Sequence, residues 1–165
     1  MEAPAPLAND RSAKTCKSSR VVIAQLMNPT YANTLGNVHG GWIMKLVDEA
    51  GALACMRHAQ QRVVTVAVDQ MSFHEPILIG DLVTVTAEVS LAGRTSMEVE
   101  VRVTSENPIS GQSIHTNTAY LVYVALDQSG RPVVVPPLIA ESPEELERME
   151  AGRRRQEHRQ QLRES

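Results

Sequence analysis

One stretch of this sequence has helical periodicity, while its other apolar runs have the character of strands. At about 100° per residue the apolar side chains of residues 40–58 gather on one side of a helix. They are Ile43, Leu46, Val47, Ala50 and Ala54. Strand-like runs, rich in β-branched residues and bounded by Gly, Pro or Asn, cover 20–27, 63–73, 81–91, 96–105 and 114–126. This order predicts an α+β domain with the helix packed across one face of an antiparallel sheet of five to six strands.

The charged residues of one strand alternate with apolar residues. Residues 97–103 read MEVEVRV, which predicts a strand with one face on the core and the other in water. Near the C-terminus, Ser142, Pro143 and Glu145 form the capping box that starts a helix. The rest of that helix has no apolar stripe, so we expect it to be solvated. The arginines at 153–155 can be interpreted as a solvated charge run or, less simply, as a phosphate clamp.

The composition favours one soluble domain and excludes several functions. The chain has 165 residues, 42% of them hydrophobic, with a net charge of −3 and 3% aromatic residues. A nucleic-acid partner is not expected, because its phosphates demand a basic face and its bases an aromatic one. No segment has the length of a membrane span or the pattern of a secretory signal, so we expect a cytoplasmic protein. We divide the chain into a disordered tail (1–19), one domain (20–140) and a charged helical tail (141–165).

The start of the long helix suits an anion. His39, Gly40 and Gly41 are expected to leave backbone N–H groups uncovered at the positive end of the helix dipole. Such a site can stabilise a developing oxyanion. The alternative is that the two glycines only permit a tight turn or close packing.

Asp48 lies further along the same helix, on a flank whose other residues are small or apolar. These neighbours are Gly41, Met44, Gly51, Ala52 and Cys55. Glu49 needs no function, because Lys45 is its partner at i,i+4. For Asp48 we weigh a surface carboxylate near Lys45 against a catalytic one, and the flank favours the second.

The distance between these two features limits how they can act together. Gly40 and Asp48 are eight residues apart, or about 12 Å along one helix. Reacting groups must come within about 3.5 Å of each other. If both are catalytic, a second copy of the chain has to lie antiparallel beside the first. The sequence then predicts a dimer with two shared sites, with the Gly41, Ala52 and Cys55 flank as a contact.

Three motifs follow one another within residues 20–150. The first is NxxxNVHGG at 33–41, followed after six residues by Asp48-Glu49; the second is VAVDQMSF at 66–73; the third is GRTSMEV at 93–99. Together they resemble the hotdog-fold acyl-CoA thioesterases, most closely the cytosolic acyl-CoA hydrolase branch. The resemblance implies a hotdog fold, a homodimer as the minimal unit, a trimer of such dimers, and hydrolysis of fatty acyl-CoA without a cofactor.

The resemblance also implies roles for particular residues. Asp48 would be the general base or nucleophile, Asn33 would hold water or substrate, and the Gly40 N–H would polarise the thioester oxygen; His39 and Gly41 belong to the same predicted site. Some relatives have a hydroxyl residue where this chain has Ala67, and we expect Thr65 to replace it from the same strand face. Residues predicted to bind coenzyme A are Arg57, Arg62, Arg94, Thr95 and Ser96.

Other chemistries fit less well. The histidines match no metal-ligand spacing, and the nucleophile elbow of serine hydrolases is absent. A hotdog hydratase or dehydratase that uses His39 is the alternative enzyme, and an acyl-CoA sensor without turnover is the alternative from another class.

Overall fold

The computed structural model describes residues 11–164. Its main sheet has the strand order β2-β4-β5-β6-β3, and all four neighbouring pairs are antiparallel. The strands are β2 (Val21–Leu26), β3 (Arg62–Met71), β4 (Leu82–Ala92), β5 (Ser96–Glu106) and β6 (Ser113–Leu126). The predicted α+β class and all five predicted strands are confirmed.

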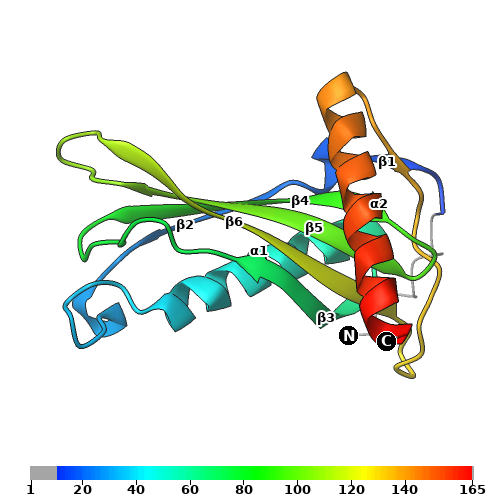
Figure 1. The fold of residues 1–165 in the computed structure, drawn as a ribbon, viewed down its shortest axis with the longest axis horizontal. Coiled ribbons are helices and arrows are strands. Elements are labelled where there is room, and N and C mark those ends of the chain that lie inside the picture. The colour runs from blue at the N-terminus through cyan, green and yellow to red at the C-terminus, as the bar shows by residue number, and fades with distance from the viewer. Residues whose placement is uncertain (1–10, 165) are drawn as a thin grey trace, which may run out of the picture.

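The long helix α1 (Gly40–Ala59) lies along one face of this sheet and contacts all five strands (Figure 1). Its predicted apolar side is buried, and it meets the valines of β4 and β5 to form the core. The helix ends at Gln60, whose left-handed backbone (φ 52°) lets its N–H bond to the Met56 carbonyl. The predicted helix, 40–58, is therefore confirmed to within one residue.

The second helix, α2 (Pro143–Glu164), crosses the opposite face of the sheet (Figure 1). Met149 and Gly152 are buried there, and Arg155 and Arg159 both pair with Glu98 of β5. The expectation that this helix is solvated is therefore wrong. The helix packs on the sheet largely through ionic contacts, and such contacts leave no apolar stripe in the sequence. The same contacts correct two further expectations: Glu98 and Glu100 are buried on the face predicted to be wet, and Arg155 is not free for phosphate.

Part of the predicted disordered tail has regular structure. Strand β1 (Lys14–Thr15) pairs in parallel with β7 (Leu138–Ile139), and the 3-10 helix η1 (Lys17–Ser19) follows it. The side chains of Cys16 and Ser19 are buried, and the Ser19 hydroxyl accepts a hydrogen bond from the Val89 N–H. Residues 1–10 of that predicted tail lie outside the described part of the chain. A second 3-10 helix, η2 (Pro29–Tyr31), begins the loop that leads to α1. Among residues 11–164, no helix is long and apolar enough to cross a membrane.

Candidate active site

At the start of α1, the backbone N–H of Gly40 is free and that of Gly41 is covered by a side chain. His39 is the N-cap, and its Nδ1 accepts a hydrogen bond from the Gly41 N–H at 2.9 Å. The Gly40 N–H has no hydrogen-bond partner in the described chain. The His39 side chain thus covers the Gly41 N–H, contrary to the expectation that the N–H groups here are uncovered, and Gly40 keeps the donor that can meet an anion.

Asn33 lies on the same pocket as Gly40. Its Oδ1 accepts from the backbone N–H groups of Leu35 (2.9 Å) and Asn37 (3.2 Å), which folds the loop before the helix and leaves the Nδ2 amide hydrogens for a ligand. The pocket has a volume of about 300 Å³. Its walls are formed by Asn33, Asn37, Val38, Gly40, Ile43, Phe73, His74, Glu75, Pro76 and Ile77.

The Asp48 carboxylate is held at one of its two oxygens. Oδ1 accepts hydrogen bonds from Thr65 Oγ1 at 2.7 Å and from Tyr123 Oη at 3.0 Å. Oδ2 accepts none from the residues that the structure describes. Lys45 pairs with Glu49 at 2.5 Å, as predicted, so it does not neutralise Asp48 by a direct bond. Asp48 therefore has an oriented carboxylate with one oxygen free for water.

A β-bulge explains why Thr65, and not position 67, reaches Asp48. Thr65 pairs with Tyr123 on β6, and Ala67 pairs with Val122, so Val66 is the extra residue. Directly opposed residues of an antiparallel pair share a face, which places Thr65 with Tyr123 toward α1 and Ala67 with Val122 on the other face. The expectation that Thr65 and Ala67 share a face is wrong, since it assumed an unbroken strand.

Tyr123 is the site residue that the sequence analysis missed. It is fully buried, and burial followed by the charge of Asp48 raises the pKa of its phenol well above its usual range. One sequence signal could have indicated it. Gly51 lies in the helix interior three residues after Asp48, and a Cβ there would be 2.5 Å from Tyr123 Oη.

The predicted flank of α1 is only partly available to another molecule. Gly51 and Cys55 are buried inside the chain, and burial raises the pKa of the Cys55 thiol far above its ordinary value. Exposed apolar residues on the same helix are Met44, Leu53 and Met56. Of the predicted contact residues, Cys55 is therefore not accessible to a second copy, whereas Gly41 is exposed and Ala52 is half-buried.

The residues predicted to bind coenzyme A divide into two groups. Thr95 and Ser96 line a pocket of about 270 Å³ together with Arg159 and Arg163 of α2. Arg62 and Arg94 are exposed, and the sheet register puts Arg62 at the same end of the sheet as Ser96. Arg57 does not join them, because its guanidinium donates to the Arg20 carbonyl beside the opposite edge strand, β2.

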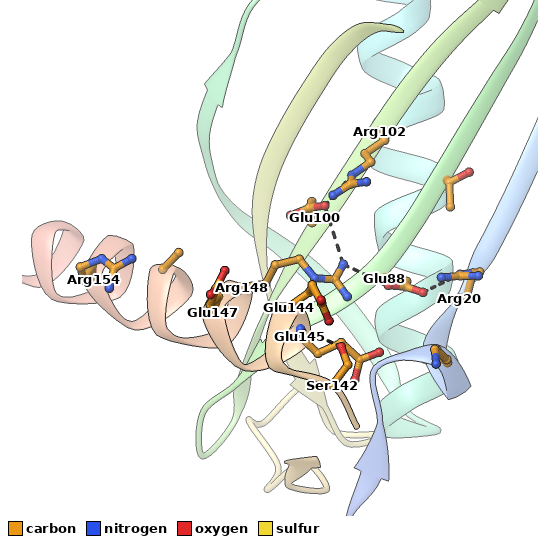
Figure 2. A pocket seen from close by; sticks show the side chains of 13 residues that line it. Arg20, Glu88, Glu100, Arg102, Ser142, Glu144, Glu145, Glu147, Arg148 and Arg154 are labelled. Carbon is orange, nitrogen blue, oxygen red and sulfur yellow. Dashed lines mark hydrogen bonds and ion pairs between the residues drawn. The ribbon is translucent and has the colours of Figure 1, made fainter. Parts of the chain in front are cut away.

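A larger hollow of about 740 Å³ lies between α2 and the outer face of the sheet, away from Asp48 and Gly40 (Figure 2). Two of its three buried carboxylates pair with arginines: Arg20 and Arg148 bind Glu88, and Arg102 binds Glu100. The third, Glu145, accepts a hydrogen bond from the Glu141 N–H just before α2. Because these glutamates and arginines pair with one another, we assign the residues around the hollow a structural role, which is to hold α2 against the sheet. Among residues 11–164, no group of three or more His, Cys, Asp or Glu residues is placed to hold a metal ion.

The long helix against an antiparallel sheet, with an N-terminal N–H donor and an oriented carboxylate, defines a thioesterase of the hotdog type. The family model for the Thioesterase superfamily matches residues 35–111. An uncharacterised acyl-CoA thioester hydrolase of Zymomonas mobilis is 35% identical over 130 residues, which are 79% of this chain and 87% of that protein. The chain belongs to the acyl-CoA thioester hydrolases, and the predicted family and fold are confirmed.

Solved structures agree with this assignment. A hexameric acyl-CoA thioesterase superposes with a TM-score of 0.88 at 35% identity, covering 92% of this chain and 97% of that one. The Staphylococcus aureus acyl-CoA hydrolase, solved with butyryl coenzyme A and coenzyme A, gives 0.85 at 32% identity and 92% coverage of each chain. The chain spans only 38% of the rat cytosolic acyl coenzyme A thioester hydrolase, to which it is 34% identical over 143 residues, 86% of this chain.

Three variants of the Staphylococcus aureus protein each replace one residue, an Asn, an Asp or a Thr, by Ala. In that protein the Asp follows the Asn by 15 residues, and the Thr follows the Asp by 17. Asn33, Asp48 and Thr65 have these same spacings. The spacing matches Thr65, rather than position 67, to the hydroxyl residue of that relative.

Proposed function

We propose that this protein hydrolyses fatty acyl-CoA to a free fatty acid and coenzyme A, at sites shared between two copies of the chain. The observation that carries the proposal is the state of Asp48: two hydroxyl donors fix Oδ1, and Oδ2 is free to accept a proton from water. The family membership and the matching spacing of Asn33, Asp48 and Thr65 support it.

The reaction needs a base and an oxyanion donor. Water bound by Asp48 and Asn33 attacks the thioester carbonyl carbon while Asp48 takes one of its protons. The negative charge that develops on the carbonyl oxygen is stabilised by the Gly40 N–H at the helix N-terminus. When the tetrahedral intermediate collapses, the C–S bond breaks and the thiolate leaves. A thiol has a pKa of about 8.5, so no strong acid is required, and the thiolate or the solvent takes the proton from Asp48. The proposal needs no metal and no cofactor other than the coenzyme A of the substrate.

A second copy is required because one chain separates the two halves of this site. Asn33 and Gly40 line one pocket, whereas Asp48 is about 12 Å along the helix and is not part of that pocket. Strand β3 is an edge of the sheet and exposes Val64, Val66 and Val68 by 45–50%. An unprotected apolar edge invites pairing with another chain. We propose that β3 pairs with β3 of a second copy, which sets the two α1 helices antiparallel, and that three such dimers assemble, in line with the hexameric neighbour.

We place the coenzyme A end of the substrate at the pocket formed by Thr95, Ser96, Arg159 and Arg163. Its two hydroxyl groups and the exposed Arg163 guanidinium suit phosphates, whereas Arg159 is already paired with Glu98 and Asp69. Val66, Val122 and Val124 give the pocket an apolar floor. Arg94 and Arg62 lie at the same end of the sheet and can add charge. We also propose that the protein acts in the cytoplasm, the compartment in the name of the rat relative.

The test is release of free thiol from short, medium and long acyl-CoAs by the wild type and by Asp48→Ala, Asn33→Ala and Glu49→Ala. Loss of the base should lower kcat by about 10² to 10⁴-fold. Glu49→Ala, the matched control next to Asp48, should keep full activity, because Glu49 pairs only with exposed Lys45. No thiol release from any acyl-CoA by a folded wild type would overturn the proposal. Hydration of enoyl-CoA would then indicate the hydratase, and binding without turnover the sensor.

A further inference from the structure

Tyr123 is completely buried where β6 passes Asp48, and its hydroxyl contacts that residue twice. Tyr123 Oη lies 3.0 Å from Asp48 Oδ1 and 2.9 Å from the Asp48 carbonyl oxygen. We propose that Tyr123 is a positioning residue for thioester hydrolysis: with Thr65 it occupies Oδ1, so that Oδ2 is the oxygen that meets the water. This inference rests on the proposed function and concerns a residue that acts only through Asp48.

Two strands bring their hydroxyl groups to the same oxygen. Tyr123 on β6 and Thr65 on β3 are directly opposed in the sheet, so both side chains leave from the face that meets α1. The bulge at Val66 follows directly, so the next opposed pair, Ala67 and Val122, lies on the other face of the sheet. The Tyr123 hydroxyl has one hydrogen, which it shares between the Asp48 carbonyl oxygen at 2.9 Å and Oδ1 at 3.0 Å. It therefore ties the carboxylate to its own backbone, while Thr65 holds Oδ1 from the neighbouring strand at 2.7 Å.

The helix is built to let the hydroxyl approach. Gly51 is in the interior of α1, where glycine is less favourable than alanine. A Cβ at this position would lie 2.5 Å from Tyr123 Oη and 3.0 Å from a methyl carbon of Val99. Glycine is therefore needed for close contact between α1 and Tyr123, and this observation is independent of the hydrogen bonds.

The surrounding charges leave the Tyr123 hydroxyl as a permanent donor. Burial and the Asp48 charge hold the pKa of Tyr123 well above its usual range, so the phenol keeps its proton. The titratable groups that act on Tyr123 are Asp48 and Cys55 of α1. Lys45 and Glu49, on the same helix, pair with each other. The side chains of β4 and β5 that pack against the helix are apolar. Tyr123 therefore stays a hydrogen-bond donor beside Asp48 at any pH at which the protein works.

The experiment compares the pH dependence of kcat and KM for the wild type, Tyr123→Phe and Tyr120→Phe, with acyl-CoA as substrate. Tyr123→Phe removes one donor from Asp48. The acid limb of the kcat profile should move to higher pH, because loss of a hydrogen bond to a charged group favours the protonated acid. We expect kcat to fall about 10-fold and KM to stay within about twofold, since the substrate does not touch Tyr123.

Tyr120→Phe is the matched control. Tyr120 lies three residues earlier on β6, and its hydroxyl donates to Glu100 at 3.1 Å on the outer face, so the acid limb should not move. If Tyr123→Phe does not fold, Tyr123→3-fluorotyrosine keeps the shape and makes the phenol a stronger donor, which should move the acid limb to lower pH. An unchanged acid limb and kcat in a folded position-123 variant would overturn the inference while leaving an active wild type, whereas an inactive wild type would overturn the proposed function instead.

Discussion

Gly51 determines how closely α1 approaches the sheet beside Asp48. An alanine there would gain about 1 kcal/mol in helix propensity. Its Cβ, however, would meet the buried Tyr123 hydroxyl at 2.5 Å and Val99 at 3.0 Å, and neither side chain has room to move away. The steric term is the larger one, so Gly51→Ala should lower the free energy of unfolding by about 1–3 kcal/mol.

Chemical denaturation of Gly51→Ala beside Glu49→Ala measures this effect. Glu49 is exposed two residues away and its replacement should change the stability by no more than about 0.5 kcal/mol. An alanine variant that is more stable than the wild type would mean that helix propensity prevails and that the close contact at Tyr123 is not tight.

The polar residues of the site could be named from the sequence, and their buried partner could not. Asp48 and Gly40 were found because a carboxylate and a glycine are out of place in an apolar helix. Tyr123 has the appearance of an ordinary core residue of a strand, and its partner on α1 is 75 positions away. The bulge at Val66 is equally hidden, because nothing in the order of the valines shows where the register changes.

Helix α2 is held to the sheet by ions rather than by an apolar stripe. Glu98 is almost completely buried; it accepts from Arg155 at 2.7 and 3.1 Å, from Arg159 at 3.1 Å and from Ser90 at 2.9 Å. Arg159 also reaches Asp69 on β3, and Arg155 lies over the Tyr120 ring at 3.6 Å. A buried carboxylate is tolerated here because all of these donors surround it.

Glu98→Ala should therefore destabilise the protein by about 3 kcal/mol, because it leaves two partly buried guanidinium groups without their common acceptor. Glu150→Ala is the control, since Glu150 is exposed on the same helix and should change stability by less than about 0.5 kcal/mol. Thermal or chemical unfolding compares the two. Equal stabilities would show that the ion pairs only break even with solvation and that other contacts hold α2.

The elements that depend on local periodicity were predictable, and those that depend on distant partners were not. The bounds of α1 and the five main strands follow from apolar period and turn residues. The regular structure of residues 14–19 depends on strand pairing with β7, more than 120 positions away. The burial of Glu98 depends on its contact with α2. A pattern of alternating charge shows a two-faced strand but does not show what covers its second face.

The whole chain presents two half-sites that cannot meet by themselves. One half is formed by Asn33 and Gly40 at the start of α1. The other is formed by Asp48, near the middle of α1, and by Thr65 of β3. A two-fold axis beside β3 would bring the first half of each copy to the second half of the other, and so make two complete sites per dimer. Two inactive variants can complement each other at a site shared between chains, whereas they cannot at a site within one chain.

Mixing two inactive variants should restore activity. When Asp48→Ala and Asn33→Ala chains are unfolded together and refolded, a mixed dimer combines intact Asn33 of one chain with intact Asp48 of its partner at one site and places both alanines at the other. Random pairing makes half of the dimers mixed, so thiol release should recover to about a quarter of the wild-type rate. Each variant refolded alone is the control and should stay inactive. If the mixture is no more active than the two controls, Asn33 and Asp48 serve the same chain, and the shared site has to be abandoned.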